Sequence, residues 1–487
     1  MAATVKPWAC IARLGGIGDN IIVSSVLPHL HKDYHVEVIA QDPQGCVFEN
    51  NPYIDKLTIK KQGDIPFTSA EEWQGWFEKR GAEYAYFRHL SHSIETELAL
   101  FPGQTKFYWP AEWRRAHCGV NYLEYLHDIC GVPYEFDPRF YPTNDERAKA
   151  VQTKSIIGDR MIGWCLSGSR IDKIYPYSAA AIAHLIRELG IPVVLFGSPT
   201  STREMSMAEE IRKHVEHVNG STTGLQFALP KWTVKDDGSI AVDDADVKSW
   251  PIRRSLALLQ QCDMVIGPDT GSMWAVAMED IPKVVLLSHA SPENIVKYWH
   301  RVIALHTTTV PCYPCHRLHS DFTYCTPNKE KNAAACISSI PIEHIVRCAQ
   351  AALTGQPVQA RSEPMSMLTD IWHKLTGTTE SAEGTAVAGQ AATPADPSAP
   401  KPVIDVEAIV QNLATQKGGG GNWRTSIVDL LHVLGLDSSA AARHTLAQEL
   451  NVTAGTDGSA ERNEALYKAL MQKLEENGGK VPDSLKG

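Results

Sequence analysis

Short apolar runs alternate with helically spaced segments over residues 1–360, and the alternation occurs twice. This pattern is typical of parallel strands connected by helices. The first pass predicts strands at 8–14, 36–40 and 84–90 and a helix at 19–30. The second predicts strands at 161–165, 192–197, 264–267 and 283–288 and helices at 179–189, 202–214, 252–260 and 272–278. We therefore expect an α/β fold with two Rossmann-like halves facing a cleft, in which ligands lie at the carboxyl ends of the strands.

The pattern changes near residue 360. An Ala/Thr/Gly/Pro-rich stretch at 377–403 predicts a flexible linker, preceded by one short helix. Beyond it, helical spacing recurs at 406–416, 426–434, 439–450 and 459–477. We expect domains at 1–155, 156–360, 361–403 (short helix and linker) and 404–487 (a small all-α domain), with a polar hairpin or loop inserted at 236–246.

Composition narrows the class of protein. The 487 residues carry 46 Lys+Arg against 56 Asp+Glu, a net charge of −10, which argues against a protein that coats nucleic acid. No apolar run is long enough for a membrane span, and the N-terminus makes a poor signal peptide. The 11 cysteines, mostly scattered singly, fit a reducing compartment. We expect a cytoplasmic protein, at most peripheral at the inner face of the inner membrane.

Three polar segments follow predicted strands. Gly15–Asp19 opens a helix, and its carboxylate can either cap that helix or take a proton from an alcohol. Ser167–Lys173 combines small residues with two cations, which suits phosphate oxygens or a solvated loop equally. Asp269-Thr270-Gly271 begins another helix, where free N–H groups suit a diphosphate or an ordinary cap.

Together these segments resemble glycosyltransferase family 9, the inverting heptosyltransferases with the two-domain GT-B fold. The resemblance covers roughly residues 7–355 and rests on R-L-x-x-I-G-D ending at Asp19, K-x-Y-P beginning at Lys173, N-P-x-I-D at 51–55 and the D-T-G helix start at Asp269. It implies that the first half holds the acceptor and the second half a nucleotide sugar. Trp274 stands where family members usually carry His.

The resemblance also implies roles for residues. Asp19 aligns with the general base that deprotonates the acceptor hydroxyl. The donor-binding positions are expected at Ser167, Ser169, Lys173, Gly197, Asp269, Thr270 and Gly271. On the acceptor side we expect Gly16, Gly18 and His92. His92 could contact the acceptor or act as an alternative base, or it could instead cap the next helix. No metal or other cofactor is expected in catalysis.

Four cysteines are clustered: Cys312, Cys315, Cys325 and Cys336. A C-x-x-C pair followed by two further thiols can close a tetrahedral metal site, or the thiols can be reduced in an irregular loop. One branch of the family, which resembles autotransporter heptosyltransferases, carries an iron-binding four-cysteine finger. A structural iron or zinc is therefore expected here.

The C-terminal runs G-G-G-G-N-W-R-T-S-I-V-D-L-L and E-N-G-G-K-V-P-D-S-L-K resemble a bacterial domain family of unknown function. We expect residues 404–487 to bind an unidentified protein partner. For the whole chain the sequence predicts transfer of a sugar, a heptose from an ADP-linked donor, to a glycan, a lipopolysaccharide core or a protein serine. The alternative is a catalytically degenerate protein that binds a nucleotide or glycan and carries a tethered adaptor domain.

Overall fold

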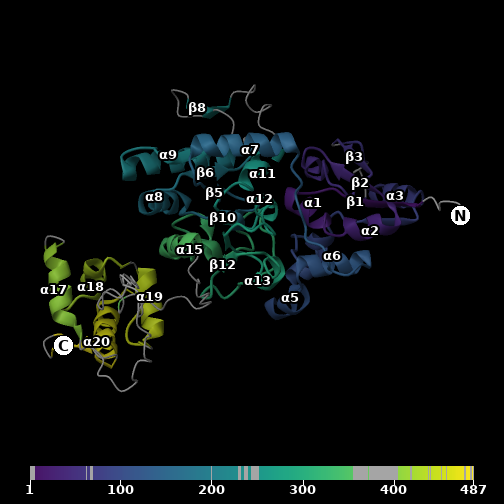
Figure 1. Ribbon diagram of the computed structural model, residues 1–487. Helices are drawn as coiled ribbons and strands as arrows, with labels where there is room; N and C mark the ends of the chain where they lie inside the picture. The colour runs from purple at the N-terminus through teal and green to yellow at the C-terminus, as the bar shows by residue number, and fades with distance from the viewer. Residues whose placement is uncertain are drawn as a thin grey trace, which may run out of the picture. The chain divides into compact units, whose positions relative to one another are not determined.

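The computed structural model describes residues 6–61, 63–65, 70–198, 200–228, 232–234, 240–242, 252–354, 371, 404–416, 419, 421–436, 438, 440–450, 452–456, 458–476, 479–482 and 485. The chain divides into two compact units, Met1–Ala360 and Arg361–Gly487 (Figure 1). The expected linker at 377–403 lies outside the described residues, and the domain boundaries predicted within each unit remain predictions.

The first sheet is four-stranded and parallel, in the order β3-β2-β1-β4. Its strands are β1 (Trp8–Arg13), β2 (His35–Gln41), β3 (Lys56–Lys60) and β4 (Tyr86–His89). The helical segments of this half are α1 (Ile17–Val23), α2 (Leu27–Asp33), η1 (Gln44–Phe48), α3 (Ala70–Gly81), α4 (Ser93–Glu97), η2 (Thr105–Tyr108), α5 (Ala111–Cys118) and α6 (Tyr122–Cys130).

The second sheet is six-stranded and parallel, in the order β7-β6-β5-β10-β11-β12. Its strands are β5 (Ile162–Cys165), β6 (Val193–Phe196), β7 (Leu225–Phe227), β10 (Met264–Pro268), β11 (Lys283–Leu286) and β12 (Val302–Leu305). Its helical segments are α7 (Asn144–Ile157), η3 (Ile171–Lys173), α8 (Ser178–Leu189), α9 (Thr202–Asn219), α11 (Ile252–Leu259), α12 (Gly271–Trp274), α13 (Pro292–Ile295), α14 (Ala335–Ser338) and α15 (Ile342–Thr354). The first four strands of each half follow the Rossmann order 3-2-1-4, so the predicted α/β fold with two Rossmann-like sheets is confirmed.

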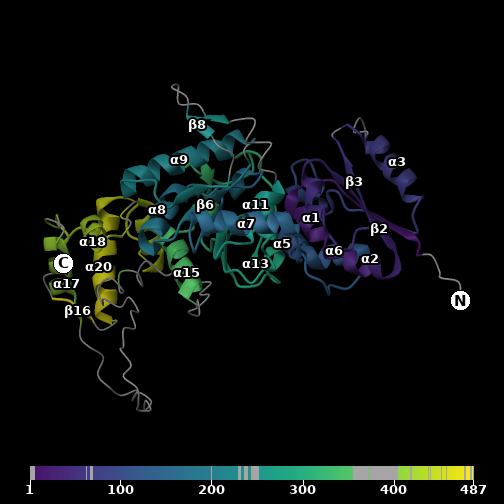
Figure 2. The same cartoon turned by 45° about the horizontal axis from the view of Figure 1, so that its top comes forward.

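Two short antiparallel pairs accompany the second sheet. They join β8 (Trp232–Val234) to β9 (Ile240–Val242), and β13 (Pro327–Asn328) to β14 (Ala333–Ala334). The first pair agrees with the hairpin expected near 236–246, although only part of that segment lies within the described residues (Figure 2).

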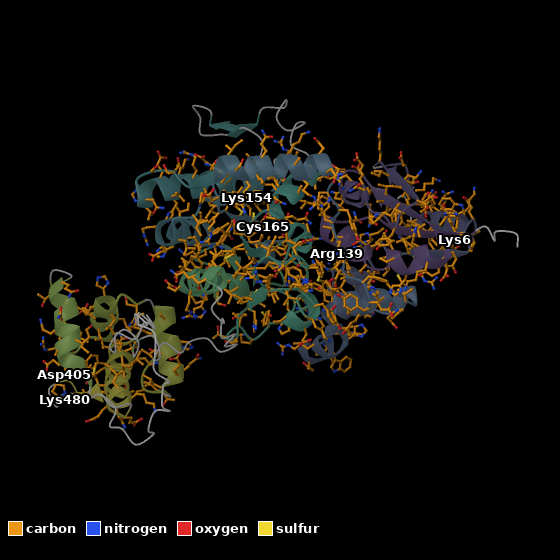
Figure 3. The ribbon with its side chains drawn as sticks, in the orientation of Figure 1. Lys6, Arg139, Lys154, Cys165, Asp405 and Lys480 are labelled. Atoms are coloured by element: carbon orange, nitrogen blue, oxygen red, sulfur yellow. The ribbon has the colours of Figure 1, made fainter. Side chains whose placement is uncertain are left out.

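One apolar cluster spans both halves of the first unit, and a second lies within the second half. Strands β1, β5, β6 and β11 are almost fully buried, because helices cover both sides of each sheet. Their unbroken apolar runs are typical of such strands. One cluster contains Ile11 and Val38 from the first sheet together with Val265 and Trp274 from the second half. Side chains fill the space between the sheets, and Cys165 at the end of β5 lies in this interior at 1% exposure (Figure 3).

The helix predicted at 19–30 is in fact two helices. α1 ends at Val23 and α2 begins at Leu27, because Pro28 has no N–H to continue the hydrogen-bond pattern. The Ser24 and Ser25 hydroxyls donate to the carbonyls of Ile21 and Ile22 at 2.6 and 2.7 Å, which completes the break.

The described residues of the second unit include four helices with given bounds: α17 (Val406–Gln416), α18 (Ile427–Leu434), α19 (Ala440–Glu449) and α20 (Ala460–Glu476). All four were predicted, and their apolar faces enclose a core that includes Trp423, Leu430, Leu446 and Leu470. A short parallel pair joins β15 (Ile404–Asp405) to β16 (Gly479–Lys480), so the predicted all-α character is correct except for these four residues. None of the helices described here is long and apolar enough to cross a membrane.

Candidate functional site

The three polar segments lie at the two points where strand order reverses. In the first sheet that point lies between β1 and β4, and in the second between β5 and β10. Parallel sheets bind ligands at such points, outside the carboxyl ends of the strands, because the connections there leave in opposite directions. Gly15–Asp19 follows β1, Ser167–Lys173 follows β5, and Asp269–Gly271 lies at the end of β10.

Asp19 occupies the first turn of α1, with its side chain 27% exposed. Its Oδ2 accepts a hydrogen bond from the backbone N–H of Gly16 at 3.2 Å and pairs with Arg13 Nη2 at 3.0 Å. The carboxylate therefore does cap its helix. Among the described residues no hydrogen bond engages Oδ1, which remains available to accept a proton.

Arg13 and Glu95 were not identified from the sequence as site residues. Arg13 is 1% exposed, donates to the Leu90 carbonyl, and pairs with Glu95 at 3.1 Å as well as with Asp19. Burial acts to lower the pKa of Arg13, but the two carboxylates raise it above its ordinary value. The signal for this residue was an arginine at the end of an otherwise apolar strand, which has to find anionic partners.

Lys173 lies at the opposite switch point, with its Nζ 3.0 Å from Asp269 Oδ2. Burial acts to lower the pKa of Lys173, while Asp269, Asp172 and Asp19 raise it above its ordinary value. Asp19 is thus near enough to act electrostatically on Lys173, although the two belong to different sheets. Asp269, expected at the donor site, contacts Lys173.

Glu204 is a further carboxylate that the sequence did not single out. It is 8% exposed and accepts hydrogen bonds from Ser167 Oγ at 2.9 Å and from the backbone N–H of Ser198 at 2.6 Å. Burial raises its pKa, although both hydrogen bonds oppose that rise. A Cβ on Gly197 would lie 3.2 Å from Glu204 Oε2, so the expected donor positions Ser167 and Gly197 both adjoin this carboxylate.

The N-terminal ends of α1 and α12 contact each other through two glycines. A Cβ on Gly18 would lie 3.1 Å from the Gly271 Cα and 3.0 Å from Trp274, and a Cβ on Gly271 would lie 2.8 Å from the Gly18 backbone nitrogen. At Gly271 a Cβ fits only if one helix moves, and at Gly18 a Cβ requires its neighbours to shift by a few tenths of an ångström. Asp19 therefore follows directly after a residue that touches the Thr270-Gly271 turn.

The other residues expected at the site make fewer contacts with the groups described above. His92 begins α4 with a left-handed backbone (φ 61°) and an exposed ring, and its side chain makes no capping hydrogen bond. Ser169 is exposed on the loop after β5, whereas Thr270 is 8% exposed. Gly16 contributes the N–H that Asp19 accepts.

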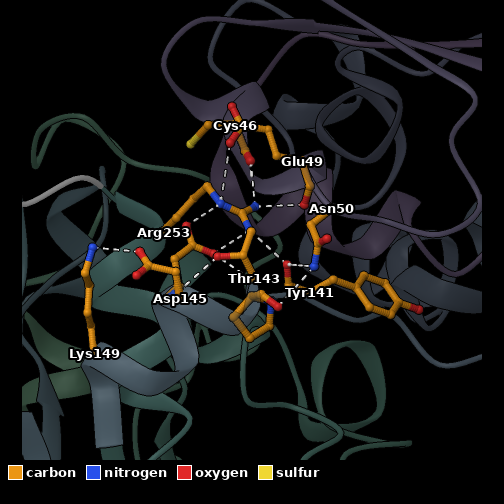
Figure 4. Close-up of polar contacts among 10 residues, drawn as sticks. Cys46, Glu49, Asn50, Tyr141, Thr143, Asp145, Lys149 and Arg253 are labelled. Carbon is orange, nitrogen blue, oxygen red and sulfur yellow. Dashed lines mark hydrogen bonds and ion pairs between the residues drawn. The ribbon is translucent and has the colours of Figure 1, made fainter. Parts of the chain in front are cut away.

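A second group of contacts joins the two halves around Arg253 of α11 (Figure 4). Its guanidinium, 4% exposed, is 2.8 Å from both carboxylate oxygens of Glu146. It also donates to the carbonyls of Cys46, Glu49 and Tyr141 at 2.8–2.9 Å. Because Cys46 and Glu49 belong to the first half, this buried arginine fixes the two sheets relative to each other.

The four clustered cysteines line one cavity in the second half. Cys315 Sγ lies 3.6 Å from His319 Nε2, and burial raises the pKa of Cys315 and Cys325 to about 12. Within the described residues, no three His, Cys, Asp or Glu side chains are arranged to hold a metal ion. The expected structural iron or zinc therefore remains a prediction.

Comparison with known proteins gives two sets of similarities. The profile of a family described as Domain of unknown function (DUF3597) matches residues 365–482. A conserved unknown protein from Rhodopseudomonas palustris, solved in solution, is 38% identical over 25% of this chain and 100% of its own, with a TM-score of 0.19. The resemblance of the C-terminal region to a domain family of unknown function is thereby confirmed.

The other solved structures match the larger unit. A glycosyl transferase of family 9 from Veillonella parvula is 17% identical over 72% of this chain and 98% of its own, with a TM-score of 0.48. The E. coli ADP-heptose LPS heptosyltransferase II is 15% identical over 71% of this chain and 98% of its own, with a TM-score of 0.45. No curated protein matches the chain.

Proposed function

Residues 365–482 belong to a family whose description names no activity, and we propose that the chain's activity resides in residues 6–354 as an inverting glycosyltransferase. The observation that supports this most strongly is the contact between Gly18 and Gly271. It brings the Asp19 carboxylate, with its free oxygen, next to a helix N-terminus and the partly buried Lys173, and so places a base beside an anion site.

The proposed reaction is a direct displacement. Asp19 Oδ1 takes the proton of an acceptor hydroxyl while that oxygen forms a bond to the anomeric carbon of the donor sugar. The bond from the anomeric carbon to the diphosphate breaks, and its electron pair leaves on the phosphate oxygen. Attack from the face opposite the leaving group inverts the anomeric centre. Arg13, held by Glu95, orients the carboxylate through their ion pairs.

The departing diphosphate requires positive charge and N–H donors. Lys173 and the N-terminus of α12 at Thr270-Gly271 supply them, and stabilisation of this kind contributes about 3 kcal/mol to a transition state. Asp269 would repel a diphosphate, so we assign it to holding Lys173. Glu204, with Ser167 and Gly197 beside it, is placed to accept hydrogen bonds from a donor hydroxyl.

The sugar and the nucleotide follow from the motif resemblance, which favours a heptose carried on ADP. The acceptor is proposed to be a hydroxyl of a glycan, a lipopolysaccharide core or a protein serine. No step uses a metal ion. A structural iron or zinc at the four cysteines is a separate proposal, tested by elemental analysis of the purified protein. Near one equivalent of either metal supports it, and neither metal present contradicts it.

A second candidate function rests on Trp274. This indole lies against Gly18, at the position where a family 9 enzyme usually has His. It forms a T-shaped pair with Trp299, and the two ring centroids are 4.9 Å apart. A chain that kept the nucleotide site but lost turnover would be a binding protein, with residues 404–487 attaching it to a protein partner.

Binding and turnover separate these functions. We would follow thermal unfolding of the full chain with ADP, UDP, GDP or CDP, since a ligand of the folded state raises its melting temperature. Selective stabilisation by ADP, followed by release of ADP from ADP-heptose with an acceptor, supports the enzyme. Stabilisation with no turnover of any donor supports the binding protein, and no stabilisation at millimolar nucleotide contradicts both.

A further inference from the structure

Asp172 is a buried carboxylate on the loop that carries Lys173, and it lines the cavity that also contains the four cysteines. It is 1% exposed and lies in η3. Its Oδ2 accepts hydrogen bonds from Ser288 Oγ at 3.0 Å and His289 Nδ1 at 3.1 Å, and its Oδ1 accepts from the backbone N–H of His319 at 3.3 Å. These three donors leave neither carboxylate oxygen free.

These partners come from two other elements. Ser288 and His289 follow β11, the strand next to β10, and His319 belongs to the segment 311–320 that contains Cys312 and Cys315. The main chain strengthens the link, since Ile171 N–H donates to the His319 carbonyl at 3.1 Å. The Lys173 loop is therefore attached to the cysteine-bearing segment through both backbone and carboxylate.

The same segment is held on its other side by the first half. Leu100 N–H donates to the His316 carbonyl, and Leu318 N–H donates to the Leu100 carbonyl, both at 2.9 Å. Arg114 of α5 donates to the Cys315 carbonyl at 2.9 Å, and Arg317 donates to the Phe107 carbonyl at 2.8 Å. The segment 311–320 thus lies between the first half and the Lys173 loop and bonds to both.

We propose that Asp172 is a positioning residue, which attaches η3 to the segment 311–320 and thereby holds Lys173 where the donor diphosphate binds. This inference rests on the proposed function. The Lys173 side chain has four rotatable bonds. Its ammonium group is held by Asp269, and its Cα is held by the backbone of η3. Loss of the Asp172 contacts frees that backbone. Donor binding then has to order the loop, and this lowers the affinity for the donor.

The test measures ADP affinity of the full chain by titration calorimetry. Asp172→Asn keeps the shape of the side chain but removes its charge, and we expect it to raise the Kd for ADP between about 10- and 100-fold. Ser288→Ala removes one of the three hydrogen bonds to Asp172, so we expect about a 3- to 10-fold rise in the Kd for ADP. This variant keeps the test available if Asp172→Asn fails to fold.

Glu37→Gln provides the matched control. Glu37 is 2% exposed and accepts from Thr58, Tyr84 and Lys56 at 2.7–3.1 Å, but it lies on β2 of the first sheet, away from the Lys173 loop. We expect Glu37→Gln to lower the melting temperature and to change the Kd for ADP less than about twofold, as a buried carboxylate of purely structural role would.

A double-mutant cycle identifies the route of the effect. If Asp172 acts through Lys173, adding Asp172→Asn to Lys173→Met changes the Kd for ADP less than about twofold. If the two substitutions raise the Kd for ADP independently, so that their effects multiply, the proposal is overturned. It is also overturned if Asp172→Asn binds ADP with the wild-type Kd. A wild-type chain that binds none of the four nucleoside diphosphates would instead overturn the proposed function itself.

Discussion

Gly271→Ala tests the contact between α1 and α12 on which the proposed active site depends. The new Cβ would lie 2.8 Å from the Gly18 backbone nitrogen and 2.8 Å from the Ile17 Cβ. Neither neighbour is the end of a flexible side chain, so one helix has to move. Inserting a methyl group of this kind into a packed contact costs about 1–3 kcal/mol of stability.

The same displacement separates Asp19 from the turn that receives the diphosphate. A misplacement of about 1 Å at reacting groups lowers turnover about 100-fold, so we expect Gly271→Ala to reduce transfer by that factor. The assays are denaturant unfolding and release of ADP from the donor. Gly75→Ala in α3 is the control, because a Cβ there meets nothing within 4 Å and the helix gains about 0.5–1 kcal/mol. Gly271→Ala with wild-type stability and turnover would refute the close contact.

Two further predictions concern buried cations. Arg253→Met removes five hydrogen bonds and leaves Glu146 without its cation, so we expect the free energy of unfolding to fall by about 3 kcal/mol. The control is Arg187→Met at an exposed arginine, which should change the free energy of unfolding by less than about 0.5 kcal/mol. Equal effects of the two substitutions would contradict the structural role of Arg253. Burial lowers the pKa of Lys283 to about 7, so between pH 7 and 10 this lysine is protonated in the unfolded chain but largely neutral in the folded one. The free energy of unfolding should therefore rise with pH in this range, by at most about 1.4 kcal/mol per pH unit. Lys283→Met should remove this dependence, and curves of stability against pH that run parallel for the two proteins would contradict the assignment.

The sheets and most helices could be predicted because local signals agree with the tertiary fold. The four helices of the second unit were predicted to within about two residues, since Ser426 and Gly435 are ordinary helix caps for α18. The break at 24–26 was missed because Ser24 and Ser25 stop a helix only through their side-chain bonds to the preceding turn, which the apolar spacing hides.

The candidate site was predictable where its residues follow strands along the chain. Asp19, Lys173 and Gly271 are of this kind, because strand order alone brings their segments to the switch points. Arg13, Glu95 and Glu204 were missed because each acts through a partner distant in sequence: 82 residues separate Arg13 from Glu95, and 37 separate Ser167 from Glu204. Asp172 was passed over because its three donors come from two other segments.

The most direct test of the account is Asp19→Asn, assayed for both binding and turnover in the full chain. Asparagine keeps the size of the side chain and can still accept from the Gly16 N–H, but it is no base. The account predicts that transfer from the donor falls between about 100- and 10,000-fold, while the Kd for ADP stays within about threefold of the wild type. Wild-type turnover by Asp19→Asn would contradict the assignment of Asp19 as the base.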